Sequence, residues 1–179
     1  MTAASLETFP ALRGLSRLAD CRPVIVVDTR EQAPLVFLRL QSVRDTLTTG
    51  DYSFRGGEDL FAIERKSIAD LVACCVGDNR ERFFRELHRL RGHKFRRLLI
   101  VGTREEIEAG GYRSQIKPAA VLATVAVIET RFDVPAVFAA SPDEAARLVE
   151  RWAWYAAREV VEAANELLRG AETQPPVVT

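Results

Sequence analysis

Hydrophobic residues follow two patterns along this 179-residue chain. Short runs rich in β-branched and other large apolar residues predict buried strands, and segments with apolar residues three or four positions apart predict helices. Gly56 and Gly57 lie between two of these runs and indicate a hairpin, so we expect the strands on either side to be antiparallel. The predicted strands cover residues 23–27, 43–54, 60–66, 95–101 and 135–139. The predicted helices cover residues 67–75, 80–91, 117–131 and 142–168, with a short helix after Thr103.

This order of elements predicts an α/β fold with a mixed central β-sheet flanked by helices on both faces. The length fits one domain, since domains usually have about 100–200 residues. We therefore expect an N-terminal arm over residues 1–20, one domain over residues 21–169 and a disordered tail over residues 170–179.

Composition narrows the class of protein only slightly. The 25 basic and 25 acidic residues cancel, so any surface that binds nucleic acid must be a local patch. The odd number of cysteines, three, predicts neither a disulfide framework nor a zinc site, and favours a reducing intracellular compartment. Without a signal-peptide pattern or a membrane-length apolar run, the sequence is typical of a cytoplasmic protein with no membrane partner.

Candidate chemistry lies on the predicted strand over residues 60–66. Side chains alternate between the two faces of a strand, so Glu64 and Lys66 share one face and Arg65 lies on the other. Asp51 belongs to the preceding hairpin strand, and Asp28 follows another buried strand. Carboxylates of this kind hold a hard divalent cation in phosphodiester hydrolysis, and a nearby lysine orients water or stabilises developing charge. Exposed strands also alternate acidic and basic residues, so this spacing alone leaves a solvated strand as an alternative.

Three sequence motifs carry a resemblance to a known family. They occur in the order Asp28-Thr29-Arg30-Glu31, Gly50-Asp51 and Glu64-Arg65-Lys66 followed by Asp70. Together they resemble the signature of the ERCC4 (XPF/Mus81-type) nuclease domain family, over roughly residues 23–150. The resemblance implies a restriction-endonuclease-like core and a metal-dependent DNA endonuclease that uses Mg²⁺ or Mn²⁺.

The resemblance also implies roles for individual residues. Asp51 and Glu64 would be the main metal ligands, Asp28 would lie near the metal or its water, and Lys66 would be the catalytic lysine. The remaining motif positions would support the site or contact backbone phosphates; they are Arg30, Glu31, Arg65 and Asp70. Three other interpretations stay open: Asp70 as part of a helix capping box with Ser67, Arg65 half exposed or paired with Glu31, and Arg30 paired with Glu31 at the surface.

The segment from Arg80 to Arg97 contains eight basic and two acidic residues. It predicts either a helix that contacts DNA phosphates or an ordinary solvated helix face. Arg80 is the foremost candidate for DNA contact, because it resembles a family arginine just past the first helix.

Trp152, Trp154 and Tyr155 lie close together in the last predicted helix, where they form part of the core or a dimer face. Members of the family typically pair their nuclease-type domains, so a homodimer is expected. The chain resembles a stand-alone version, of prokaryotic or phage type, without the family's helicase or helix-hairpin-helix regions.

The sequence thus predicts a DNA endonuclease, structure-selective for branched, flapped or forked DNA, in DNA repair or recombination. The alternative is a non-catalytic DNA-binding or scaffold subunit of a nuclease complex. A metabolic α/β enzyme is disfavoured, because the Gly56-Gly57 pair lies in a hairpin rather than at a strand–helix junction that binds phosphate.

Overall fold

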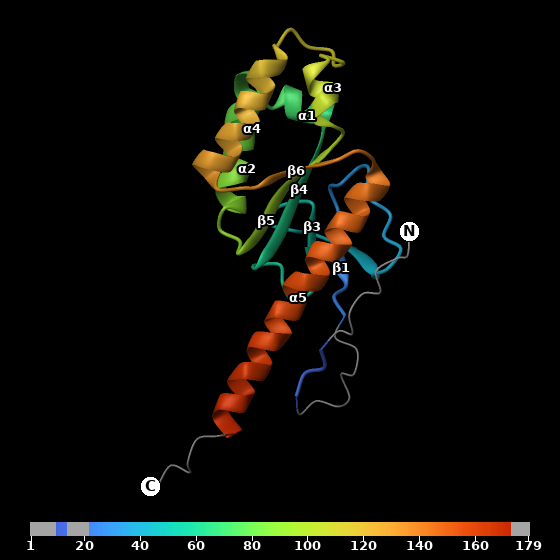
Figure 1. Cartoon of the computed structure of the whole chain (residues 1–179), viewed down its shortest axis with the longest axis vertical. Helices are drawn as coiled ribbons and strands as arrows, with labels where there is room; N and C mark the ends of the chain where they lie inside the picture. The colour runs from blue at the N-terminus through green and yellow to red at the C-terminus, as the bar shows by residue number, and fades with distance from the viewer. Residues whose placement is uncertain (1–9, 14–21, 173–179) are drawn as a thin grey trace.

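The computed structural model describes residues 10–13 and 22–172. In this part of the chain one six-stranded sheet has the order β2-β1-β3-β4-β5-β6. The short central strand β3 is antiparallel to both of its neighbours, and the other pairs are parallel. The expected mixed α/β sheet and the hairpin are therefore confirmed (Figure 1). The strands are β1 (Ile25–Asp28), β2 (Ser42–Asp45), β3 (Tyr52–Phe54), β4 (Phe61–Ser67), β5 (Phe95–Val101) and β6 (Ala136–Ala139).

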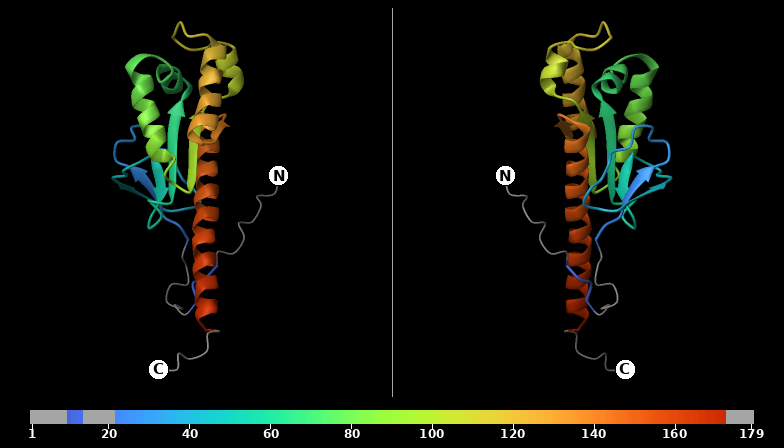
Figure 2. Two further views of the ribbon diagram at one scale, coloured as in Figure 1. Left: turned by 90° about the vertical axis from the view of Figure 1, so that its left-hand side faces the viewer. Right: turned by 90° about the vertical axis from the view of Figure 1, so that its right-hand side faces the viewer.

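Helices cover both faces of the sheet. One face packs against the long helix α5, and the other packs against the remaining helices (Figures 1 and 2). Strand β4 shows why its sequence alternates: Phe61 and Ile63 belong to the core beneath α5, whereas Ala62 belongs to the opposite core. The helices are α1 (Ile68–Ala73), α2 (Gly77–Leu90), α3 (Arg104–Glu108), α4 (Pro118–Phe132) and α5 (Pro142–Glu172).

The structure divides the single strand expected over residues 43–54. Its first part is β2, an exposed edge strand parallel to β1, and its last part is β3. The intervening loop contains Gly50, whose φ of 76° lies in the left-handed region that favours glycine. A side chain there would also meet the main-chain oxygen of Ile63 at 2.9 Å, so this turn depends on glycine.

Helix α5 extends well past the end of the sheet (Figures 1 and 2). It ends at Glu172, three residues inside the expected tail, and residues 173–179 lie outside the described part. Of the expected arm, residues 10–13 are described: the amide of Asn165 donates to the main-chain oxygen of Ala11 and accepts from the main-chain nitrogen of Arg13. Residues 1–9 and 14–21 lie outside the described part. No helix among the described residues is both long enough and apolar enough to cross a membrane.

The aromatic cluster of α5 divides between core and surface. Trp154 is buried, Trp152 packs against the same core, and Tyr155 is 49% exposed. Farther along α5, Val160, Leu167 and Leu168 are also exposed. The tryptophans therefore contribute to the core, and the apolar surface of α5 lies mainly beyond the sheet.

Candidate active site

Three carboxylates lie in a row across the three central strands. The antiparallel register pairs Tyr52 with Ile63, so the next residues along, Asp51 and Glu64, face each other across β3 and β4. On the other side of β3, the main-chain nitrogen of Asp28, the last residue of β1, donates to the main-chain oxygen of Asp51 at 2.9 Å. The register of the sheet thus brings together Asp28, Asp51 and Glu64, which are 36 positions apart at their extremes in the sequence.

Asp28 is buried and fully engaged by hydrogen bonds. The Arg30 guanidinium donates to both of its oxygens, at 2.7 and 3.0 Å, and the main-chain nitrogen of Leu47 adds a bond of 2.7 Å. Burial alone would raise the pKa of Asp28, but these donors outweigh it and lower the pKa. The interpretation of Arg30 and Glu31 as a surface ion pair is therefore wrong, because Arg30 pairs with Asp28 across a tight turn.

Glu31 instead pairs with Arg65. Nε and one terminal nitrogen of Arg65 each donate to a different oxygen of Glu31, both at 3.0 Å, which is the two-pronged geometry of a strong ion pair. The side chain of Glu31 is 6% exposed and that of Arg65 is 15% exposed. Glu31 also accepts a hydrogen bond from the main-chain nitrogen of Ala33. This pair ties the turn after β1 to β4 and confirms the Arg65–Glu31 interpretation.

The surroundings of Asp51 and Glu64 raise their pKa values, whereas those of Asp28 lower its pKa. Burial, then the negative charge of Glu64, raises the pKa of Asp51 to about 7, although the main-chain nitrogen of Arg65 donates to it at 2.7 Å. Burial also raises the pKa of Glu64, more than the neighbouring Lys66 lowers it. Two desolvated carboxylates that repel each other are what a bound cation would stabilise.

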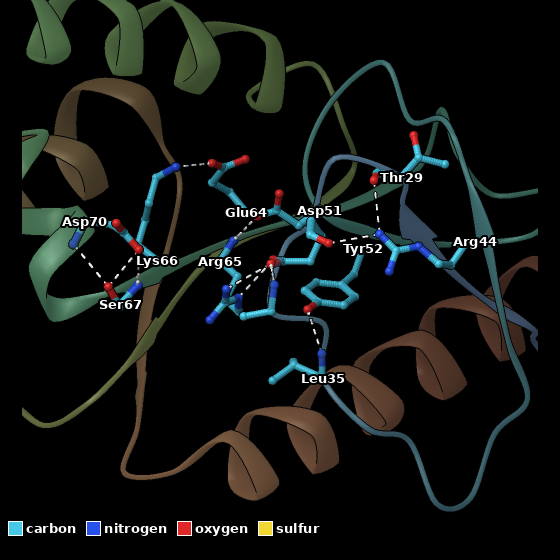
Figure 3. Close-up of polar contacts among 12 residues, drawn as sticks. Thr29, Leu35, Arg44, Asp51, Tyr52, Glu64, Arg65, Lys66, Ser67 and Asp70 are labelled. Carbon is cyan, nitrogen blue, oxygen red and sulfur yellow. Dashed lines mark hydrogen bonds and ion pairs between the residues drawn. The ribbon is translucent and has the colours of Figure 1, made fainter.

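Lys66 lies beside Glu64 on the same face of β4, as alternation predicts (Figure 3). Its Nζ donates to Oε1 of Glu64 at 2.5 Å and is 3.9 Å from Oε2 of Glu86 on α2. Burial would lower the pKa of Lys66, but Glu64 outweighs it and raises the pKa. The side chain therefore remains an ammonium ion at neutral pH.

Two cavities meet at this site and share the side chains of Arg30, Asp51 and Lys66. The smaller, of about 220 Å³, is lined by four acidic and three basic residues. The larger, of about 480 Å³, is lined by three acidic and four basic residues. The smaller cavity is called the acidic cavity below, and the larger is called the basic cavity. Besides the three shared residues, the acidic cavity is lined by Asp28, Glu64, Glu86, Arg89 and the loop over residues 48–50. The basic cavity is also lined by Glu31, Arg65, Asp70, Asn79 and Arg82, among others.

Two sequence-predicted residues lie farther from the centre. Asp70 forms a reciprocal capping box with Ser67 at the start of α1, so its capping role is confirmed, and it lines the edge of the basic cavity. Arg80 lies over the Phe84 ring and donates to the main-chain oxygen of Cys75; it lines neither cavity. Its contact with DNA stays a prediction.

The sequence predicted a basic helix that contacts DNA, but it did not identify the residues of α2 that line the site. Arg82, Glu86 and Arg89 follow one another at spacings of four and three residues, so they share one face of the helix, and all three line the cavities. The buried stripe of Phe83, Leu87 and Leu90 was the available signal, since residues next to an apolar stripe lie at the rim of the helix.

The donor set suits a hard divalent cation. Magnesium is usually held by one or two carboxylates, with waters and substrate phosphate completing its octahedral shell. Asp51 and Glu64 line an open cavity and supply such oxygens. Among the described residues no group of three His, Cys, Asp or Glu side chains is arranged to hold a metal ion. The carboxylate of Asp28 is already bound by the Arg30 guanidinium. The fit therefore rests on Asp51 and Glu64.

The fold and the site define an α/β domain with an acidic, lysine-containing centre at the ends of its central strands. The chain belongs to the ERCC4 domain family, whose model matches residues 27–151. A solved structure of XPF from Aeropyrum pernix is similar, with a TM-score of 0.61 and 21% identity over 87% of this chain and 76% of that chain. A second, of XPF from Aeropyrum pernix in complex with DNA, has a TM-score of 0.56 and 20% identity over 87% and 69%. A comparison with curated protein sequences gave no match.

Proposed function

We propose that this protein is a metal-dependent DNA endonuclease that hydrolyses phosphodiester bonds. The observation that carries the proposal is a pair of mutually repelling carboxylates, the half-buried Asp51 and the buried Glu64, beside the Lys66 ammonium in an open cavity. Membership of the ERCC4 domain family and the likeness to an XPF structure solved with DNA support DNA as the substrate.

In this proposal Asp51 and Glu64 hold Mg²⁺ or Mn²⁺. When bound, the ion supplies a Lewis acid for the scissile phosphate and lowers the pKa of a bound water. Lys66 has a raised pKa, so it acts as a cation rather than as a proton acceptor, and it stabilises negative charge that develops on the phosphate oxygens. Arg65 holds the site in shape through Glu31, and its main-chain nitrogen orients Asp51. Metal ligation by Asp28 would require Arg30 to release it.

The test is a cleavage panel with purified protein and Mn²⁺ on flaps, forks, Holliday junctions, single strands and plain duplex. We expect cutting of branched or flapped DNA, and we expect Glu64→Ala to bind DNA without cutting. Glu58→Ala, which changes a partly exposed carboxylate in the β3–β4 hairpin, is the matched control and should cut normally. Cutting by the Glu64→Ala protein would refute the assigned site.

A second candidate is a non-catalytic DNA-binding or scaffold subunit in DNA repair or recombination. The engagement of Asp28 by Arg30, without a third donor placed for a metal in the described residues, is the observation that favours it. In that case the wild-type protein would bind the panel's DNA but cut none of it with either metal, and Mn²⁺ would leave its melting temperature unchanged.

A homodimer stays part of the proposal. The exposed apolar residues of α5, Tyr155, Val160, Leu167 and Leu168, offer a surface for a second copy of this chain. Light scattering coupled to size-exclusion chromatography measures the oligomeric state. A monomer at all concentrations would contradict this part of the proposal without affecting the assigned site.

A further inference from the structure

Residues of helix α2 line both cavities of the site, and the two cavities differ in the balance of their charges. The acidic cavity contains the carboxylates proposed to hold the cation, and it also contains Glu86. The basic cavity begins at the same shared residues and extends to Asn79 and Arg82 at the other end of the helix face. A DNA strand whose scissile phosphate lies at Asp51 and Lys66 therefore has a second, more basic cavity immediately beside it.

Most of the charges in the basic cavity are already used within the protein. Arg30 is bound to Asp28, Arg65 to Glu31, and Lys66 to Glu64. Arg82 differs from them: its guanidinium donates only to the neutral amide oxygen of Asn79, at 3.1 Å, and no carboxylate within residues 22–172 lies at ion-pair distance. A positive charge that is not neutralised by the protein is available for an anion.

The neighbours of Arg82 add neutral donors. Asn79 and Gln32 are exposed and line the same cavity, and the amide nitrogens of both side chains are hydrogen-bond donors. An arginine with amide donors is a combination that recognises phosphate, because the planar guanidinium can bind two phosphate oxygens at once. The cavity volume of about 480 Å³ leaves room for more than one phosphate group.

We propose that the basic cavity is a subsite for the nucleotide next to the scissile phosphodiester, and that Arg82 binds its phosphate with help from Asn79 and Gln32. The inference rests on the proposed function, since it takes DNA as the substrate. In this proposal the Arg82 and Glu86 ends of the cavity-lining face of α2 have different roles. The Arg82 end contacts the neighbouring phosphate, and the Glu86 end faces the catalytic cavity.

Binding of Arg82→Gln in the non-cutting Glu64→Ala background tests the subsite. Arg85→Gln is the matched control, because Arg85 is an exposed arginine on the same helix that lines neither cavity. We expect Arg82→Gln to weaken binding about tenfold, the size of one charge-assisted hydrogen-bonded contact, and Arg85→Gln to change it less than about twofold. Arg82→Lys keeps the charge and should retain part of the affinity. Thermal melting of all three variants confirms that they fold.

A neutral methylphosphonate placed at successive linkages of the DNA identifies the phosphate itself. At the linkage that Arg82 contacts, the proteins with and without the Arg82→Gln substitution should bind equally, whereas at other linkages the tenfold difference should persist. Equal binding by Arg82→Gln and Arg85→Gln on unmodified DNA would overturn the subsite. So would a difference that no methylphosphonate removes.

The two proposals fail in different ways. If the wild-type protein cuts DNA but Arg82→Gln behaves like Arg85→Gln, only the subsite is wrong. If the wild-type protein binds DNA in the Arg82-dependent manner but never cuts it, the subsite stands as a DNA-binding site and the endonuclease proposal is wrong.

Discussion

The ion pair between Glu31 and Arg65 is the contact that ties the turn after β1 to the central strand β4. Replacing Glu31 with glutamine keeps the shape of the side chain and the acceptor for the main-chain nitrogen of Ala33. It removes the negative charge opposite Arg65, whose side chain is only 15% exposed and would remain charged. The perturbation therefore leaves a half-buried guanidinium without its counter-charge.

The expected cost follows from the geometry. Breaking a buried ion pair by removing one partner costs about 3–5 kcal/mol, but glutamine can still accept one hydrogen bond from Arg65, which reduces the loss. We expect Glu31→Gln to lower the free energy of unfolding by about 2–3 kcal/mol. For a domain of this size that corresponds to a fall of about 5–10 °C in the melting temperature.

Urea unfolding of Glu31→Gln beside the wild type measures this difference. Glu58→Gln is the control, because Glu58 forms a looser pair with Arg55, at 3.8 Å and with both side chains partly exposed; we expect a change below about 0.5 kcal/mol. If Glu31→Gln proves as stable as Glu58→Gln, the pair contributes no net stability and the reasoning is refuted.

The dependence on pH supplies an independent check. Burial would raise the pKa of Glu31, but Arg65 outweighs it and lowers the pKa below the ordinary value of 4.5. A lowered pKa means that the folded state binds fewer protons than the unfolded state at mildly acidic pH. The contribution of Glu31 is therefore complete above about pH 4.5 and is lost as the pH falls through the folded-state pKa. The difference between Glu31→Gln and the wild type should be constant near neutrality and shrink in acid.

Further outcomes are expected at two glycines, at the cap of α1 and at the proposed metal site. Gly50→Ala should destabilise the fold by about 2–4 kcal/mol, because it combines a left-handed φ with a 2.9 Å contact to the main chain of β4. Gly56→Ala, at a similar φ but in open space, should cost only about 1–2 kcal/mol in the same urea unfolding assay. Ser67→Ala should cost about 1 kcal/mol, since it removes half of the capping box with Asp70, and equal stability to wild type would contradict the capping role. Saturating Mn²⁺ at about 100 times its Kd should stabilise the wild type by about 2.7 kcal/mol, and Asp51→Asn should abolish that thermal shift.

The sequence was sufficient to predict the arrangement on β4. Alternation along the strand placed Glu64 and Lys66 on one face, and the structure has them in contact at 2.5 Å. The hairpin signal at Gly56 and Gly57 then predicted that Asp51 approaches β4, and the structure has Asp51 directly before β3, with its main-chain nitrogen donating to the main-chain oxygen of Ile63. Both inferences succeeded because they depend on local rules, the two-residue period of a strand and the conformation of a turn.

The ion-pair partners of the charged residues were harder to predict from the sequence. Arg30 has acidic residues within two positions on either side, and sequence spacing does not decide between Asp28 and Glu31. The structure decides through Leu47, whose main-chain nitrogen binds Asp28 and whose oxygen binds Arg30, and Leu47 comes from a loop 17 residues later. The apolar stripe of α2 indicates which residues lie at the rim of the helix, but the contact between Glu86 and Lys66 also depends on how α2 packs against β4.

The directions of the pKa shifts divide the site into a supporting part and a reactive part. Asp28 and Glu31 are buried, yet arginine donors lower the pKa of both, so each stabilises the fold as a paired charge. Asp51 is half-buried and Glu64 is buried in the same row, and burial raises the pKa of both, so their negative charges destabilise the fold in the absence of a cation. Shifts of this second kind are characteristic of catalytic and ligand-binding groups. Because Arg30 and Arg65 hold the supporting pair in place, the unfavourable charges of the reactive pair remain side by side in the cavity, where a divalent cation would turn their repulsion into binding energy.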